Sequence, residues 1–165
     1  MRMELIQPFI NAADAVLADS LQCPTSIGSL SMEEEAYRRK GVAALIAVTG
    51  DIEGRIIFDV DPQTAMRVAS RFAGEELPES EDLMRETVCE LANQVIGNAV
   101  TSLNDQGFRF RVHPPEIHTS EKGHKSSEDT EALVMCIETP KGKVFMNVAM
   151  RYTQRREEHA TAAHK

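Results

Sequence analysis

Four residues with groups suited to docking or catalysis recur at helical spacing in the middle of the chain. They are Glu86, Glu90, Asn93 and Gly97, and no proline interrupts residues 83–104 around them. At about 100° per residue, this spacing places all four in one narrow stripe along a helix. The stripe would present carboxylates, a carboxamide and a patch of bare backbone to whatever docks there. We refer to these four residues as the polar stripe.

The opposite side of the same segment is apolar. The positions that face away from the polar stripe are Met84, Val88, Leu91, Val95, Ala99 and Leu103. Residues 83–104 are therefore predicted to form one amphipathic helix, about 33 Å long, with its apolar face in a core. A polar helix face is usually plain solvated surface. However, Asn93 and Gly97 are poor helix formers that cost about 0.5 and 1 kcal/mol relative to alanine, so something other than helix stability favours them.

Composition and charge restrict the class of protein and of partner. The 165 residues favour a single domain, expected over residues 1–154, with a disordered charged tail at 155–165. The net charge of −8 argues against nucleic acid as a partner. It suits either a protein partner with a basic rim or solubility alone. No apolar run approaches the roughly 20 residues of a membrane span, and no signal peptide is evident. Three cysteines without a CxxC motif read as reduced thiols, so the predicted location is cytoplasmic.

Helices are expected at residues 2–20, 62–73 and 83–104. The regular part of the first is expected to begin near Pro8, because proline disrupts a helix interior. The second has Asp61 as its N-cap, Pro62 at its first position and Gly74 at its end. The residues that it is predicted to bury are Ala65, Val68, Ala69 and Phe72.

Three strands are expected between the first and second helices, and four more after the third. The expected segments are residues 27–32, 42–50, 53–60, 108–112, 116–119, 132–138 and 143–152. Hairpins are expected to join 42–50 to 53–60 and 132–138 to 143–152. Residues 120–130 read as a loop. One-sided helices and a one-sided sheet pack most economically as two layers. The predicted fold class is therefore α+β, a mostly antiparallel sheet packed against long helices.

Other sites for chemistry are not evident. His113, His118 and His124 cluster loosely around Pro114 and Pro115, but their spacing matches no usual metal signature, so no metal site is predicted. The chain also lacks a nucleophile elbow, a phosphate-binding glycine loop and a Cys–His pairing pattern. A self-contained hydrolase is not indicated.

Taken together, these residues resemble the CheX branch of the CheC/CheX/FliY phosphatases of bacterial chemotaxis. The resemblance lies in Glu90-Leu-Ala-Asn93, in the following Ile96-Gly97-Asn98-Ala99, and in Pro114-Pro115 after the strand FRFRV. In that family a Glu-x-x-Asn pair on a long helix is followed, a little over twenty residues later, by a proline. A single such pair favours CheX over the two-site CheC proteins. Some members carry Asp or Ser four residues before the glutamate, where this chain has Glu86.

The resemblance implies a CheC-like fold and removal of phosphate from the phospho-aspartate of a CheY-like response regulator. The regulator would supply Mg²⁺ and a lysine, and this chain would need no cofactor of its own. Asn93 would orient the attacking water, and Glu90 would pair with the regulator's lysine. Gly97 would allow close approach of the partner backbone, and Glu86 would either extend the acidic docking edge or be plain surface. The resemblance also implies a homodimer built through the sheet.

Three alternatives remain open at this point. A non-catalytic adaptor of the same fold would bind a response regulator without hydrolysing it, and a module related to the flagellar switch would do the same within a structural assembly. In an unrelated α+β dimer, the polar stripe would be solvated surface.

Overall fold

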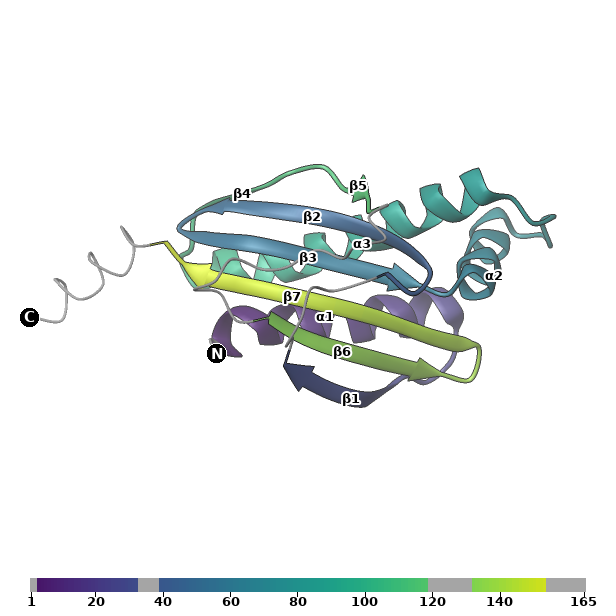
Figure 1. Cartoon of the computed structure of the whole chain (residues 1–165), viewed down its shortest axis with the longest axis horizontal. Helices are drawn as coiled ribbons and strands as arrows, with labels where there is room; N and C mark the ends of the chain where they lie inside the picture. Colours follow the sequence, from purple (N-terminus) through teal and green to yellow (C-terminus); the bar gives the residue numbers. More distant parts are fainter. Residues whose placement is uncertain (1–2, 33–38, 119–131, 154–165) are drawn as a thin grey trace, which may run out of the picture.

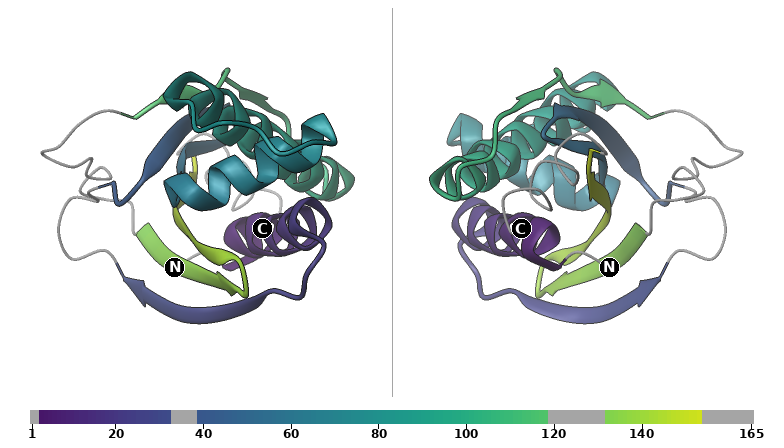
Figure 2. Two further views of the ribbon diagram at one scale, coloured as in Figure 1. Left: turned by 90° about the vertical axis from the view of Figure 1, so that its right-hand side faces the viewer. Right: turned by 90° about the vertical axis from the view of Figure 1, so that its left-hand side faces the viewer.

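The computed structural model describes residues 3–32, 39–118 and 132–153. Its sheet is covered on one face by three helices, α1 (Met3–Leu21), α2 (Pro62–Ala73) and α3 (Glu81–Asp105) (Figures 1 and 2). The strands are β1 (Ser26–Met32), β2 (Val42–Gly50), β3 (Ile52–Val60), β4 (Phe110–Val112), β5 (Glu116–Ile117), β6 (Ala132–Thr139) and β7 (Gly142–Tyr152). The predicted two-layer α+β class is confirmed. The predictions for the 120–130 loop, for His124 and for the tail after residue 154 lie outside the described residues.

Two hairpins form the middle of the sheet. The strand order is β1-β6-β7-β3-β2-β4, with β5 also pairing with β2, and every described pair is antiparallel. Both predicted hairpins, β2–β3 and β6–β7, are present. The FRFRV strand is shorter than predicted, since it begins only at Phe110. Arg109 instead donates its backbone N–H to the Asp51 carboxylate, at 2.9 Å, and holds the β2–β3 turn.

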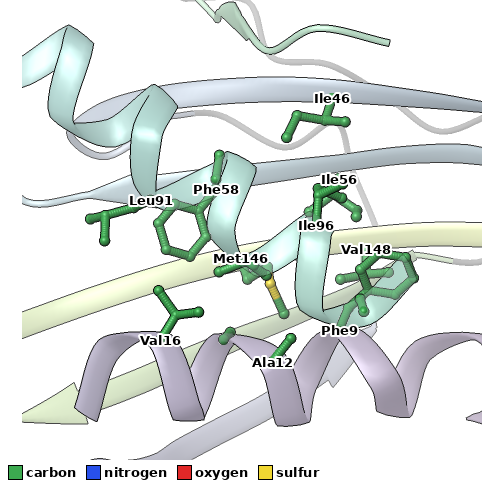
Figure 3. Packing of buried hydrophobic residues seen from close by; sticks show 14 of the residues in the cluster. Phe9, Ala12, Val16, Ile46, Ile56, Phe58, Leu91, Ile96, Met146 and Val148 are labelled. Atoms are coloured by element: carbon green, nitrogen blue, oxygen red, sulfur yellow. The ribbon is translucent and has the colours of Figure 1, made fainter. Parts of the chain in front are cut away.

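The core lies between the sheet and the helices. Figure 3 shows side chains of α1, α3, β2, β3 and β7 meeting there, among them Phe9, Phe58, Leu91 and Met146. All four are at most 1% exposed. Because α3 contacts α1, α2, β2, β3 and β5, it is held from several sides at once.

Helix α3 spans 25 residues and extends the predicted segment 83–104 by two residues at its start and one at its end. The Ser80 hydroxyl accepts a hydrogen bond from the Leu83 backbone N–H at 3.2 Å, which satisfies one of the free donors at the helix start. The predicted apolar face is confirmed, since every position predicted to face the core is buried. The buried set also includes Thr87, Ala92 and Ile96.

Two expectations for the other helices were wrong. Helix α1 begins at Met3, with Pro8 inside it, because Leu5 and Ile6 at its start are buried and this burial outweighs one missing backbone hydrogen bond. In α2, Phe72 is 48% exposed, although the other three positions of its predicted face are buried. The cap residues of α2 act as predicted: the Asp61 carboxylate accepts from two backbone N–H groups, and Gly74 ends the helix with a left-handed φ of 75°.

Candidate functional site

The structure brings the four residues of the polar stripe together on the outer face of α3. Glu86, Glu90, Asn93 and Gly97 are all exposed, and each follows the previous one after about one helical turn. Behind them, Leu91 is fully buried and Val95 is 1% exposed. The buried side of α3 therefore fixes the direction in which the stripe faces. In Figure 1, α3 passes behind strands β2 and β3, in the helical layer.

Glu90 is held by a neighbour that the sequence-based reasoning missed. The Gln94 side-chain amide donates a hydrogen bond to Glu90 Oε1, at 3.2 Å. A signal for this contact was available, because residues four apart on a helix face each other. Gln94 lies at the border of the stripe and is exposed.

The Asn93 carboxamide has no hydrogen-bond partner within the described part of the chain. It is exposed and lies one turn beyond Glu90. A carboxamide carries two N–H donors and an oxygen with two lone pairs. All of these are therefore available to water or to an incoming molecule.

Nothing in the described part of the chain requires a glycine at position 97. A Cβ built on it would meet no atom within 4 Å, and its backbone φ is not positive. Its carbonyl oxygen accepts a hydrogen bond from the Thr101 hydroxyl at 3.1 Å. The missing side chain leaves a flat patch of backbone directly beside Asn93.

The acidic half of the stripe is not neutralised by the described cations. Glu86 and Glu90 are four residues apart, a spacing at which like charges destabilise a helix by about 0.2–0.5 kcal/mol. The nearby Arg85 pairs with Glu81 instead, at 3.1 Å. The described residues thus leave both stripe glutamates without an ion-pair partner.

The proline pair lies between two short strands at the edge of the sheet. Pro114 is exposed and Pro115 is half-buried, and β5, which follows them, contacts α3. His113 shares a hydrogen bond with the Thr49 hydroxyl at 3.1 Å, whereas His118 is buried. No group of three or more metal-ligating side chains converges among the residues that the structure describes.

A cleft among the described residues lies away from the polar stripe. A cleft of about 420 Å³ lies between the end of α1, α2 and the β6–β7 turn, and its lining includes Arg67, Ser70 and Lys141 but no stripe residue. The stripe itself lies along an exposed helix face. Such a face suits a macromolecular partner better than a small molecule, which usually binds in a concave pocket.

Two cysteines lie near the core. Cys89, on α3, and Cys136, on β6, are free thiols, and burial raises the pKa of both. Both are therefore protonated at neutral pH.

In the described ranges, no helix is long and apolar enough to cross a membrane.

Comparisons with known proteins identify relatives of this chain. The family model "Chemotaxis phosphatase CheX" matches residues 42–139. The CheY-P phosphatase CheX of Thermotoga maritima is 24% identical over 118 residues, which cover 71% of this chain and 76% of the relative.

Solved structures give the same picture. A CheC-like superfamily protein from Shewanella sp. PV-4 has a TM-score of 0.79 at 21% identity, covering 92% of this chain and 99% of the other. A chain of the CheX–CheY–BeF3–Mg²⁺ complex from Borrelia burgdorferi has a TM-score of 0.72 at 34% identity, covering 91% of this chain and 99% of the other. Since the family model spans more than half of the sequence and this last relative matches nearly all of it, the chain belongs to the CheX family of chemotaxis phosphatases.

Proposed function

We propose that this protein hydrolyses the phospho-aspartyl group of a CheY-like response regulator. Membership of the CheX family supports this function, as does the Thermotoga maritima relative, a CheY-P phosphatase. The observation that carries the proposal is that Glu90 and Asn93 lie one turn apart on the exposed face of a helix held by several elements. The Asn93 carboxamide has no hydrogen-bond partner among the described residues. This pair can complete an active site only on a second molecule that brings the phosphoryl group.

The reaction needs little from this chain. An acyl phosphate is already reactive, and the regulator would supply Mg²⁺ and a lysine to carry the charge on the phosphoryl oxygens. A water attacks phosphorus, the bond from phosphorus to the aspartyl oxygen breaks, and the aspartate leaves as a carboxylate. What remains is to hold that water in line with the breaking bond.

Asn93 is the residue proposed to hold the water. Its carboxamide oxygen would accept a hydrogen bond from the water, which directs an oxygen lone pair toward phosphorus. Its NH₂ group is uncharged and can donate to a phosphoryl oxygen. A carboxylate at this position would instead repel the phosphoryl group.

The other three stripe residues are proposed to dock the regulator. Glu90 would accept from the regulator's lysine, a charge-assisted hydrogen bond that also fixes the register of docking. Gly97 would let the partner backbone come close. Glu86 is exposed and has no ion-pair partner among the described residues. It would extend the acidic docking edge toward a basic rim on the regulator.

A direct assay tests this function. The regulator is loaded with Mg²⁺, phosphorylated with acetyl phosphate, and its dephosphorylation is followed with and without this protein. The wild type is expected to accelerate the decay. Asn93→Ala should lower kcat at least about 100-fold, the usual size of the effect of positioning a reacting group, while still binding a beryllofluoride-treated regulator. Glu90→Ala should raise KM as well as lower kcat.

The matched control is Asn104→Ala, which removes the same type of side chain from the same helix about 16 Å further along its axis. It should leave kcat unchanged. A wild type that binds the regulator but never accelerates its dephosphorylation would establish the adaptor function instead. A wild type that does neither would remove the response regulator as a partner.

A homodimer is proposed as well. Strand β1 forms one end of the described strand order, and Ile27 on it is 44% exposed. An exposed edge strand with an apolar side chain is a template for pairing with a second copy. Ile27→Lys should therefore shift the mass measured by light scattering toward the monomer. The cytoplasmic location stays a prediction.

A further inference from the structure

Glu90 differs from Glu86 in how its carboxylate is held. Glu90 Oε1 accepts the Gln94 amide at 3.2 Å, and Glu90 Oε2 accepts no hydrogen bond from the described residues. One oxygen is therefore anchored while the other remains available to an incoming cation. Glu86 has Glu90 at the corresponding position four residues later, so it faces a like charge in place of a donor.

The donor that holds Glu90 is uncharged. A lysine at position 94 would form the i,i+4 Glu–Lys pair in the orientation that best stabilises a helix. The lysine ammonium group would also neutralise the Glu90 carboxylate. A carboxamide fixes the carboxylate and leaves its full negative charge for a partner. The chain has glutamine at this position, although an ion pair would favour the isolated helix.

We propose that Gln94 is a positioning residue, which sets the Glu90 carboxylate in its docking orientation without neutralising it. The inference rests on the function proposed above and adds a residue to it. Gln94 touches neither the phosphoryl group nor the attacking water in this scheme. Its effect should therefore appear mainly in KM, with a smaller fall in kcat than Glu90→Ala causes.

Gln94→Met is the first test, because methionine has nearly the same length but donates no hydrogen bond. Holding one long side chain at an interface changes binding about two- to tenfold, so KM should rise by that factor. The matched control is Gln7→Met on α1, since Gln7 is also exposed and donates to a neighbour four residues away, Asn11, at 2.9 Å. This control should leave both kcat and KM unchanged.

A double-mutant cycle with Glu90→Ala is the deciding experiment. If Gln94 acts through Glu90, Gln94→Met should have no further effect on KM once Glu90 is alanine. An equal rise in KM in both backgrounds would mean that Gln94 contacts the regulator itself and would overturn the inference. Gln94→Lys completes the test: it should keep or raise the melting temperature yet raise KM more than Gln94→Met does. Full activity of Gln94→Lys would refute the need for an uncharged donor.

Failure of the inference can be told apart from failure of the proposed function. If the wild type does not accelerate dephosphorylation of the regulator, the proposed function fails, independently of any result for the Gln94 variants. If the wild type accelerates it and the two substitutions act independently on KM, only the role of Gln94 fails.

Discussion

Replacing Gly97 with alanine is expected to make the protein more stable and, at the same time, less active. A Cβ at this position meets no atom within 4 Å, and the backbone of Gly97 is helical, so alanine fits without strain. Alanine is more favourable than glycine inside a helix by about 0.8–1.0 kcal/mol. For a chain of this size, the melting temperature should rise by about 2–4 °C.

The same methyl group should obstruct docking. If the partner backbone packs directly on Gly97, an added methyl group costs about 1–3 kcal/mol, as overpacking does at other close-packed contacts. This corresponds to a rise in KM of about 5- to 150-fold. Because kcat depends on how Asn93 places the water, kcat should change less than KM.

Two measurements on the purified variant decide the matter: thermal unfolding, and regulator dephosphorylation as a function of regulator concentration. Ser102→Ala is the control, because Ser102 is exposed on α3 outside the polar stripe. It should stabilise the helix by about 0.5 kcal/mol and leave KM unchanged. A Gly97→Ala variant that is more stable and retains the wild-type KM would refute the close approach of a partner at this residue.

Three further predictions concern charge, capping and pH. Glu86→Gln should raise KM at 0.1 M salt and lose this effect at 1 M, where the Debye length falls to about 3 Å. The effect of Glu90→Gln on KM should persist at 1 M salt, because Glu90 is proposed to contact the regulator directly. Equal salt dependence of the two variants would contradict these roles. Ser80→Ala removes the cap of α3 and should cost about 1 kcal/mol in urea unfolding with unchanged turnover per folded molecule; a selective loss of turnover would contradict a purely capping role. Since burial raises the pKa of Cys89 and Cys136, the folded state holds both thiol protons more tightly, and the free energy of unfolding should fall as the pH rises above about 8.5. Replacing both cysteines with alanine should flatten that pH dependence, and an unchanged slope would refute its assignment to the thiols.

The site helix was predictable because its signal is local. The apolar positions of residues 83–104 repeat with the helical period, and this period alone fixes which side chains face out. Glu90 and Asn93 accordingly lie where the sequence placed them. The contact of Gln94 with Glu90 was not predicted, although residues four apart on a helix face each other.

The features that were not predicted depend on contacts between distant segments. Pro8 was expected near the helix start, but packing of α1 against α3 and β7 extends the helix past it. Phe72 lies on the predicted side of α2, yet periodicity gives only the direction of a side chain and not whether another element covers it. The short β4 has the same origin, because Arg109 bonds to Asp51, a residue 58 positions earlier in the chain.

The packing of α3 has a consequence for how activity is lost. All proposed site residues lie on one helix whose inner face, including Leu91 and Ala99, is fully buried against other elements. Such a segment does not open alone, since opening it would expose the central core. Beyond its first turn, its hydrogen-bonded backbone amides should therefore exchange with solvent deuterium only when the whole domain unfolds. The lifetime of the proposed phosphatase site is then the lifetime of the fold itself, with no partly open state in between.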